Sequence, residues 1–172
     1  MQRVLVIGSP GAGKSTLAHE LACRTGLPLH HLDRMHWLPG WIERDRADGL
    51  NAIKQVLADD RWIIDGNYGS SLPLRLTRAD TVVWLDYPTT LCLGRVFKRW
   101  WQYRGHTRPD MTEGCPETLN LEFLLYVLNF RRAWQNRNAQ ALAGFAGTIA
   151  RLSAPAAAQR WLETLPQTAQ RD

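Results

Sequence analysis

The stretch GSPGAGKS, residues 8–15, fits the pattern G-x-x-x-x-G-K-[ST] at every position. In this pattern the glycines let backbone N–H groups converge on phosphate oxygens, the lysine reaches the outer phosphates, and the last hydroxyl ligates Mg²⁺. An apolar run at residues 4–7 precedes the stretch and a helical pattern at 14–25 follows it, as the mechanism requires. We therefore expect ATP and Mg²⁺ to bind here; a structural glycine-rich turn is the alternative. The expected nucleotide ligands are Gly8, Ser9, Pro10, Gly11, Ala12, Gly13, Lys14, Ser15 and Thr16.

Outward from this stretch, short apolar runs alternate with longer helical patterns. The alternation is typical of an α/β fold in which helices cover both faces of a mostly parallel sheet. We expect strands at residues 4–7, 29–32, 62–65, 81–86 and 148–152, and helices at 14–25, 45–58, 88–103, 119–141 and 156–165. The length of 172 residues and the 45% of hydrophobic positions fit a single domain over residues 1–172.

Positive charge is concentrated in one part of the chain. The net charge is +5, and residues 94–151 hold nine basic and four acidic side chains, whereas the rest of the sequence is balanced. Arginine supplies 18 of the 21 basic residues, and its planar group binds phosphate or carboxylate through two hydrogen bonds. We therefore expect this segment to bind an anionic partner.

Composition excludes several classes of protein. The three cysteines Cys23, Cys92 and Cys115 are too few and too widely spaced for a disulfide framework or a four-cysteine zinc site. No apolar run reaches the roughly 18 residues of a membrane span, and the apolar run at the start is too short for a signal peptide. We expect a reduced cytoplasmic protein without a membrane partner, either a monomer or a homodimer.

Two aspartates end predicted strands beside the phosphate-binding stretch. Asp65 ends the strand at 62–65, at the sheet edge where ligands of open α/β sheets bind, and we assign it with Ser15 to the Mg²⁺ shell. A loop-capping role is the alternative for Asp65. Asp33 ends the second strand, where it is expected to orient or deprotonate an acceptor hydroxyl or to bind Mg²⁺; an N-cap is the alternative.

Arginines surround a loop rich in proline and glycine at residues 104–117, which we expect to act as a mobile lid over phosphates. Solvated surface charges are one alternative. Nucleic acid is another, since Trp100, Trp101 and Tyr103 lie nearby. The arginines are Arg95, Arg99, Arg104, Arg108, Arg131, Arg132 and Arg137. Lys14, Asp33, Arg95, Arg99 and Arg132 are the expected catalytic residues, and Arg95 and Arg99 are also expected to contact ATP.

An acceptor segment is expected at about residues 33–60. Asp33, His36, Trp37 and Trp41 are expected to form its wall, although aromatic residues at this place fit a core equally well. The histidines His30, His31 and His36 do not predict a metal site, because adjacent strand residues point to opposite faces.

Missing motifs narrow the class of nucleotide-binding protein. The sequence has no D-x-x-G after its third strand and no N-K-x-D, which a switch GTPase needs, and Asp65 is followed by Gly66 rather than the glutamate of an oligomeric motor. A small kinase needs only a phosphate loop, an acceptor pocket and an arginine lid.

The sequence resembles the adenylate kinase-like P-loop kinases, and more closely the bacterial DNA topology modulation proteins. The matching segments are GSPGAGKS (8–15), LDRMHWLPGW (32–41), WIIDGNY (62–68), ADTVVWLDYP (79–88), LCLGRVFKRW (91–100) and RPDMTEGCPE (108–117). The resemblance implies a five-stranded parallel sheet of order 2-3-1-4-5, use of ATP and Mg²⁺, and a lid at about 104–117. It also implies that Arg95 and Arg99 lie between lid and core, that Arg132 and Arg137 follow the lid, and that Ser153–Pro155 contacts adenine.

The sequence departs from adenylate kinases in its acceptor segment. Adenylate kinases read D-G-[FY]-P-R after the third strand, whereas residues 65–68 here are Asp-Gly-Asn-Tyr and the next arginines are Arg75 and Arg78. Arg75 and Arg108 complete the expected acceptor ligands. We expect phosphoryl transfer from ATP to a nucleotide, a nucleoside or a small hydroxylated metabolite. The alternatives are a nucleotide-dependent regulatory or nucleic-acid-binding protein that affects DNA topology, and a nucleotide-binding fold that has lost catalysis.

Overall fold

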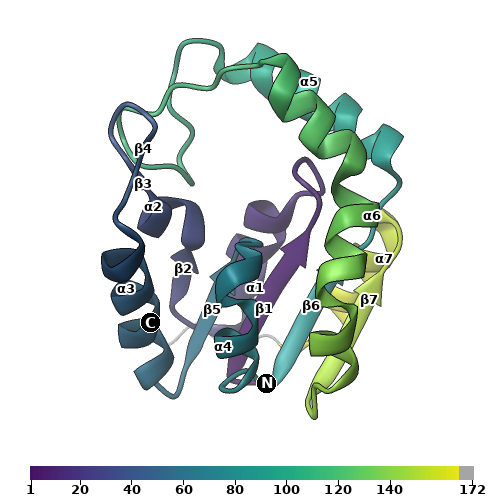
Figure 1. Cartoon of the computed structure of the whole chain (residues 1–172). Helices are drawn as coiled ribbons and strands as arrows, with labels where there is room; N and C mark the ends of the chain where they lie inside the picture. Colours follow the sequence, from purple (N-terminus) through teal and green to yellow (C-terminus); the bar gives the residue numbers. More distant parts are fainter. Residues whose placement is uncertain (167–172) are drawn as a thin grey trace, which may run out of the picture.

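The computed structural model describes residues 1–166, apart from the side chains of residues 135–140. Five parallel strands form one sheet in the order β2-β5-β1-β6-β7 (Figure 1). The strands are β1 Arg3–Gly8, β2 Leu29–His31, β5 Trp62–Asp65, β6 Thr81–Leu85 and β7 Thr148–Leu152. Counted in chain order among themselves, these strands have the order 2-3-1-4-5, so the expected sheet is confirmed.

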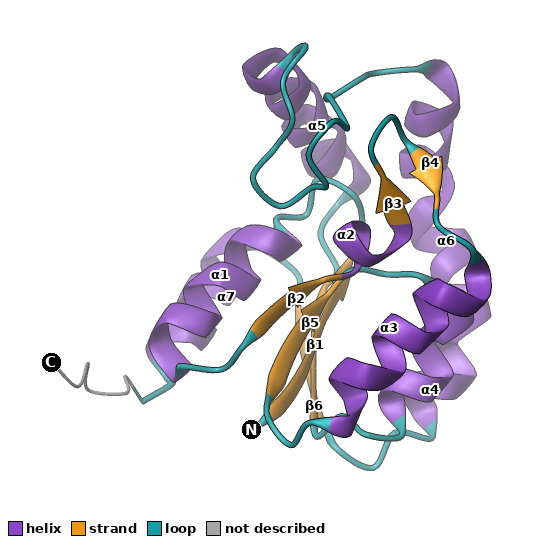
Figure 2. Cartoon of the chain, turned by 90° about the vertical axis from the view of Figure 1, so that its left-hand side faces the viewer, coloured by secondary structure: helices purple, strands orange, loops and turns teal. Residues whose placement is uncertain are grey.

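Helices cover both faces of this sheet and make three layers (Figure 2). In β1, Val4 and Val6 pack into a core with α1 and α7, whereas Leu5 and Ile7 pack into a second core with α3, α4 and α6. A strand buried on both faces reads as a continuous apolar run, which is why β1 was recognisable from sequence. The helices are α1 Lys14–Thr25, α2 Leu32–His36, α3 Arg46–Ala58, α4 Leu72–Leu76, α5 Thr89–Tyr103, α6 Leu121–Ala143 and α7 Pro155–Glu163.

The register of the sheet brings the ends of the strands to one edge. Val6 of β1 is paired with Asp65 of β5, and Asp65 is paired in turn with His31 of β2. On the other side, Gly8 is paired with Leu85 of β6. The loops that follow β1, β2 and β5 therefore lie together, as the rule for ligand sites in parallel α/β sheets requires.

Five short elements were not expected from the sequence. They are α2, the hairpin of β3 Trp37–Leu38 and β4 Ile42–Glu43, the 3-10 turn Gly69–Ser71, and α4. The segment after β5 reads as a loop because of its glycines and Pro73, yet Pro73 lies in the first turn of α4, where a missing N–H costs nothing.

The segment between α5 and α6 crosses the top of the molecule and returns beside the β3–β4 hairpin (Figure 1). It lacks helix and strand, as expected, but isolated bridges join Arg104 to Glu117 and Thr107 to Pro116. Its chain ends are therefore held together at the base of a loop. Within residues 1–166, the search for a helix long and apolar enough to cross a membrane finds none.

Candidate functional site

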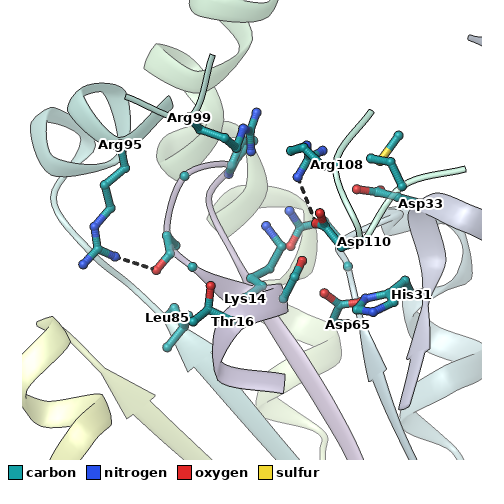
Figure 3. A pocket seen from close by; sticks show the side chains of 18 of the residues that line it. Lys14, Thr16, His31, Asp33, Asp65, Leu85, Arg95, Arg99, Arg108 and Asp110 are labelled. Atoms are coloured by element: carbon teal, nitrogen blue, oxygen red, sulfur yellow. Dashed lines mark hydrogen bonds and ion pairs between the residues drawn. The ribbon is translucent and has the colours of Figure 1, made fainter. Parts of the chain in front are cut away.

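A cavity of about 1850 Å³ opens at the carboxyl edge of the sheet. Its floor is the loop between β1 and α1, and its walls come from α5, α6, α7, the lid and the hairpin. Figure 3 shows Lys14 in the middle of this space, with Arg95 and Arg99 above it and Asp65 and His31 to one side. Most of the residues that the sequence assigned to nucleotide, metal and acceptor therefore line one cavity, although they come from separate segments of the chain.

Three glycines determine the backbone conformation of the loop at the floor of the cavity. Gly8, Gly11 and Gly13 all have positive φ, of 150°, 80° and 93°. A Cβ on Gly8 would lie 2.5 Å from the carbonyl oxygen of Leu85, and one on Gly11 would collide with the carbonyl oxygen of Cys92. Only glycine allows this loop to pass so close to its neighbours.

Residues 10–16 line the cavity, as expected, but Gly8 and Ser9 do not. The side chain of Asn67 accepts a hydrogen bond from the N–H of Gly8 at 3.1 Å and donates one to its carbonyl oxygen at 2.8 Å. The N–H of Gly8 is thus already used within the chain, and the structure gives no support to the expected contact of Gly8 with nucleotide. Gly8 instead fixes the loop to the segment after β5.

Lys14 begins α1, directly after Gly13, which has no side chain to cap the helix. The first turn therefore presents N–H groups and the positive end of the helix dipole to the cavity. The Lys14 ammonium donates to the carbonyl oxygen of Ser9 at 3.2 Å. Burial lowers the pKa of Lys14, while Asp33 and Asp65 act in the opposite direction. This geometry suits a polyphosphate.

Asp65 is buried at the end of β5, and one of its oxygens lies 2.7 Å from Nδ1 of His31. The hydrogen bond to Asp65 raises the pKa of His31, although burial opposes it. Sequence reasoning missed His31, because it was considered only as a metal ligand. The signal that could have found it is its position, since a residue ending β2 lies beside the residue ending β5.

The acceptor side of the cavity is built from α2, the hairpin and the segment after β5. The hydroxyl of Tyr68 donates to Asp33 at 3.1 Å, and Trp37, Trp41 and Tyr68 line the cavity. Burial raises the pKa of Tyr68, and Asp33 acts in the same direction, so this hydroxyl keeps its proton. The expectation for Asp33, Trp37 and Trp41 agrees with this placement, and Tyr68 is a wall residue that the sequence did not reveal.

His36 does not line the cavity. Its ring packs on Tyr68, with ring centroids 4.4 Å apart, and on Trp37 at 4.9 Å. His36 therefore supports two wall residues from behind, and the expected direct contact with the acceptor is corrected to this supporting role.

Arg75 was expected to bind the acceptor, and its position contradicts that role. The side chain is completely buried and lies outside the cavity lining. It donates to the hydroxyl of Ser71 and to the backbone carbonyl oxygens of Gly66, Asn67 and Tyr68. A guanidinium group with five donors can satisfy several carbonyls at once, so Arg75 holds the loop after β5 in shape.

Arg95, Arg99 and Arg108 all line the cavity, as expected. Arg95 donates to the carbonyl oxygen of Ala12 in the phosphate loop at 3.0 Å (Figure 3). Arg132 is exposed and outside the lining, because the part of α6 that faces the cavity carries Tyr126, Phe130 and Trp134. This position gives no support to the expected catalytic role of Arg132. The side chain of Arg137 lies outside the described residues.

Two further arginines of the basic segment are engaged away from the phosphate loop. Arg131 and Arg151 both donate to the buried carboxylate of Asp86, at 3.0 Å and 2.9 Å. Arg104 lies over the ring of Trp100, 5.6 Å from its centroid. The arginines of the basic segment therefore form two groups. One group faces the cavity, and the other joins helices and strands.

Asp110 of the lid reaches the phosphate loop, and sequence reasoning missed it. Its carboxylate accepts a hydrogen bond from the Ser15 hydroxyl and one from Arg108 at 2.9 Å. Burial acts to raise its pKa, but Arg108 and Ser15 outweigh this and hold the pKa of Asp110 below its ordinary value. The signal in the sequence was that few acids occur in the basic segment 94–151, so those present are candidates for ion pairs.

The donor groups around Ser15 fit Mg²⁺. Ser15, Asp65 and Asp110 offer hydroxyl and carboxylate oxygens, which are the ligands that this hard cation prefers. In the described part of the chain no three His, Cys, Asp or Glu residues form a cluster able to hold a metal alone. Mg²⁺ in phosphoryl-transfer sites commonly takes one or two protein ligands and completes its shell with phosphate and water.

Comparison with protein-family profiles finds no match, and no curated sequence matches either. Solved structures with similar folds include shikimate kinase from Acinetobacter baumannii in complex with shikimate, with a TM-score of 0.59 at 18% identity over 95% of this chain and 92% of that chain. A sugar kinase from Janibacter sp. HTCC2649 has a TM-score of 0.51 at 19% identity, covering 95% of this chain and 93% of that chain. Deoxyadenosine kinase from M. mycoides has 0.55 at 14% identity, covering 93% and 94%. The chain therefore has the P-loop kinase fold.

Proposed function

We propose that this protein is a small-molecule kinase that transfers a phosphoryl group from ATP to a hydroxyl of its acceptor, with Mg²⁺. The observation that carries the proposal is the shared cavity, in which Lys14 of the phosphate loop, Asp33 of the acceptor wall, and Arg95, Arg99 and Arg108 all meet. Phosphoryl transfer needs positioning and charge stabilisation more than covalent chemistry, and these groups supply both.

Each residue has a role in this proposal. The amides of residues 10–16 and Lys14 hold the β- and γ-phosphates, and Ser15 and Asp65 hold Mg²⁺. The metal neutralises charge on the phosphates. Arg95 and Arg99 contact ATP and stabilise the transferring group together with Arg108.

On the acceptor side, Asp33 orients the attacking hydroxyl. Tyr68 donates to one of its oxygens, which fixes the carboxylate and keeps it a hydrogen-bond acceptor. Trp37 and Trp41 form the aromatic wall next to it. The names of the structural neighbours include kinases of shikimate, sugars and deoxyadenosine, and these support a hydroxylated small molecule or nucleoside as acceptor.

The closer resemblance, to the adenylate kinase-like DNA topology modulation proteins, remains part of this proposal. It rests on the sequence segments around the phosphate loop, the acceptor wall and the lid. AMP is a weaker candidate as acceptor than its use by adenylate kinases suggests, because Arg75, the next arginine after Asp65, is buried against backbone carbonyls.

A nucleic-acid partner gains no support from the arrangement of the arginines. Arg99 and Arg108 face the cavity and pair with acids there, and Arg131 and Arg151 pair with Asp86. Binding to a phosphate backbone would need these charges free on one surface.

An ADP-release assay over a panel of nucleosides, nucleotides, sugars and hydroxy acids tests the proposal. We expect ADP release that depends on one class of acceptor and disappears in Lys14→Ala. ADP release that is the same with every acceptor, or its absence with all of them, would contradict a kinase function.

A further inference from the structure

Glu117 is not among the site residues expected from the sequence. Glu117 closes the lid segment, is buried, and lines the cavity. One oxygen, Oε1, lies 2.8 Å from both Nε and Nη2 of Arg99, and the other, Oε2, lies 2.6 Å from Nε of Arg108. A single carboxylate thus joins an arginine of α5 to an arginine of the lid.

This carboxylate leaves part of each arginine available. Arg99 uses Nε and Nη2 on Glu117, whereas Arg108 forms an ion pair with Glu117 through Nε, without hydrogen-bond geometry, and donates from Nη1 to Asp110. Within the described part of the chain, no hydrogen bond engages Nη1 of Arg99 or Nη2 of Arg108. Both groups lie above Lys14 in the cavity (Figure 3), so these nitrogens are available to an anion bound over the phosphate loop.

Two buried guanidinium groups lie side by side only where a negative charge offsets their mutual repulsion. Burial lowers the pKa of Arg99 and the nearby charge of Arg108 lowers it further, whereas Glu117 acts in the opposite direction. Removing the carboxylate would leave two like charges in mutual repulsion. Arg108, carried by the lid, would then keep its hydrogen bond to Asp110 but lose the carboxylate that joins it to Arg99.

Glu117 itself is held independently of the arginines. Its N–H donates to the carbonyl oxygen of His106 at 2.9 Å, and an isolated bridge pairs it with Arg104. These bonds close the base of the lid loop. The carboxylate is therefore anchored at the base, and it can hold Arg108, nine residues earlier in the chain, in a defined place.

We propose that Glu117 is a positioning residue, which holds Arg99 and Arg108 side by side over the phosphate loop so that both engage the outer phosphates of ATP. The proposal rests on the proposed function for the identity of the anion. It assigns to Glu117 no direct contact with the reacting atoms.

A double-mutant cycle tests this role through nucleotide affinity, measured on the full chain as the Kd of a non-hydrolysable ATP analogue with Mg²⁺. The variants are Glu117→Gln, Arg108→Gln and the two combined, with Glu113→Gln as the control, because Glu113 is an exposed glutamate of the same loop. We expect Glu117→Gln to weaken binding by about fivefold or more when Arg108 is present and by less than about twofold when Arg108 is glutamine. Glu113→Gln leaves the affinity unchanged.

Equal factors in the two backgrounds would overturn the proposal, because Glu117 would then act independently of Arg108. If Glu117→Gln binds the analogue as tightly as the control Glu113→Gln does, the proposal is overturned too. If Glu117→Gln does not fold, judged by its circular dichroism, Glu117→Asp replaces it, since aspartate keeps the charge but ends one methylene short of the arginines. Positioning predicts the same weakened binding for Glu117→Asp, and wild-type affinity there would contradict it.

The cycle also separates this proposal from the proposed function. A wild-type protein that binds the analogue but phosphorylates no acceptor would contradict the kinase function, while the cycle would still decide the role of Glu117. A wild-type protein that does not bind the analogue would overturn both.

Discussion

The indole nitrogen of Trp41 donates a hydrogen bond to the carbonyl oxygen of Pro116 at 3.0 Å and so joins the β3–β4 hairpin to the lid. Trp41 has a positive φ of 61°, a backbone conformation that a bulky side chain adopts only when its surroundings hold it. The hydroxyl of Thr112 donates to the carbonyl oxygen of Trp37 at 2.7 Å, and the thiol of Cys115 donates to that of Leu38 at 3.2 Å. The acceptor wall and the lid are therefore one connected unit.

This connection predicts that the two segments open together. Trp41→Phe keeps an aromatic ring and removes the N–H, so we expect amide hydrogen exchange to rise about fivefold in both residues 37–43 and residues 104–117, in line with the loss of one hydrogen bond. Trp101→Phe is the control, because Trp101 is 73% exposed. Faster exchange in the hairpin alone would show that the hairpin opens without the lid.

Lys14→Ala is expected to lower the rate of phosphoryl transfer by about 100-fold or more, because the Lys14 ammonium lies against the phosphate loop, where it donates to the carbonyl oxygen of Ser9. The measurement is the initial rate of ADP release with the best acceptor of the panel. Lys54→Ala, in an exposed part of α3, controls for the loss of a lysine. Full activity in Lys14→Ala would remove the phosphate loop from the mechanism.

Arg75→Met is expected to lower the free energy of unfolding by about 3 kcal/mol, because backbone carbonyl oxygens that now accept from the guanidinium lose their buried donor. Urea denaturation measures this change. The matched control is Arg46→Met on the exposed surface of α3. If stability is instead unchanged and only the KM for the acceptor rises, Arg75 binds substrate after all.

Asp33→Asn is expected to reduce kcat by about 100-fold while the KM for ATP stays the same, since Asp33 lies on the acceptor side. Tyr68→Phe removes only the hydroxyl that orients Asp33, so about a tenfold loss is expected. Steady-state kinetics with both substrates varied gives these values. Asp59→Asn, an exposed change at the end of α3, serves as control. A raised KM for ATP in Asp33→Asn would instead place Asp33 on the nucleotide.

The pair of His31 and Asp65 predicts a pH dependence of stability. The pKa of His31 in the folded protein is raised above its ordinary value of 6.5, mainly by the hydrogen bond to Asp65. The folded state therefore binds the proton more tightly than the unfolded state does. The contribution of the His31–Asp65 pair to stability is complete below pH 6.5 and is lost as the pH rises through the raised pKa of His31.

His31→Gln is expected to remove this contribution. Urea denaturation between about pH 5 and about pH 9 should then show a flatter profile than the wild type, whereas His19→Gln, at an exposed position on α1, should keep the wild-type shape. A profile in His31→Gln that parallels the wild type at every pH would mean that another group causes the dependence.

Local sequence predicted much of the fold. The apolar runs at β1, β5 and β6 are buried on both faces, so their composition alone marks them as strands. The elements α2, β3, β4 and α4 were missed because each is five residues or shorter, which is too little chain to show a period.

The candidate site divides in the same way. Residues 8–15 and the helix after them could be recognised from the sequence, because the glycines, the lysine and the hydroxyl of the pattern stand at a fixed spacing along the chain. Arg75, Arg99, Arg108 and Arg132 carry the same side chain and could not be told apart there. Burial and partners distinguish them, and these come from segments far along the chain.

What the sequence determined by itself was a phosphate-binding loop in a parallel α/β sheet, because glycine conformations and apolar runs act locally. Tertiary structure alone decided that Arg75 holds backbone carbonyls, that Arg132 faces outward, and that Glu117 joins Arg99 to Arg108. The physical reason is that the partner of a charged side chain depends on which distant segments fold beside it and exclude water.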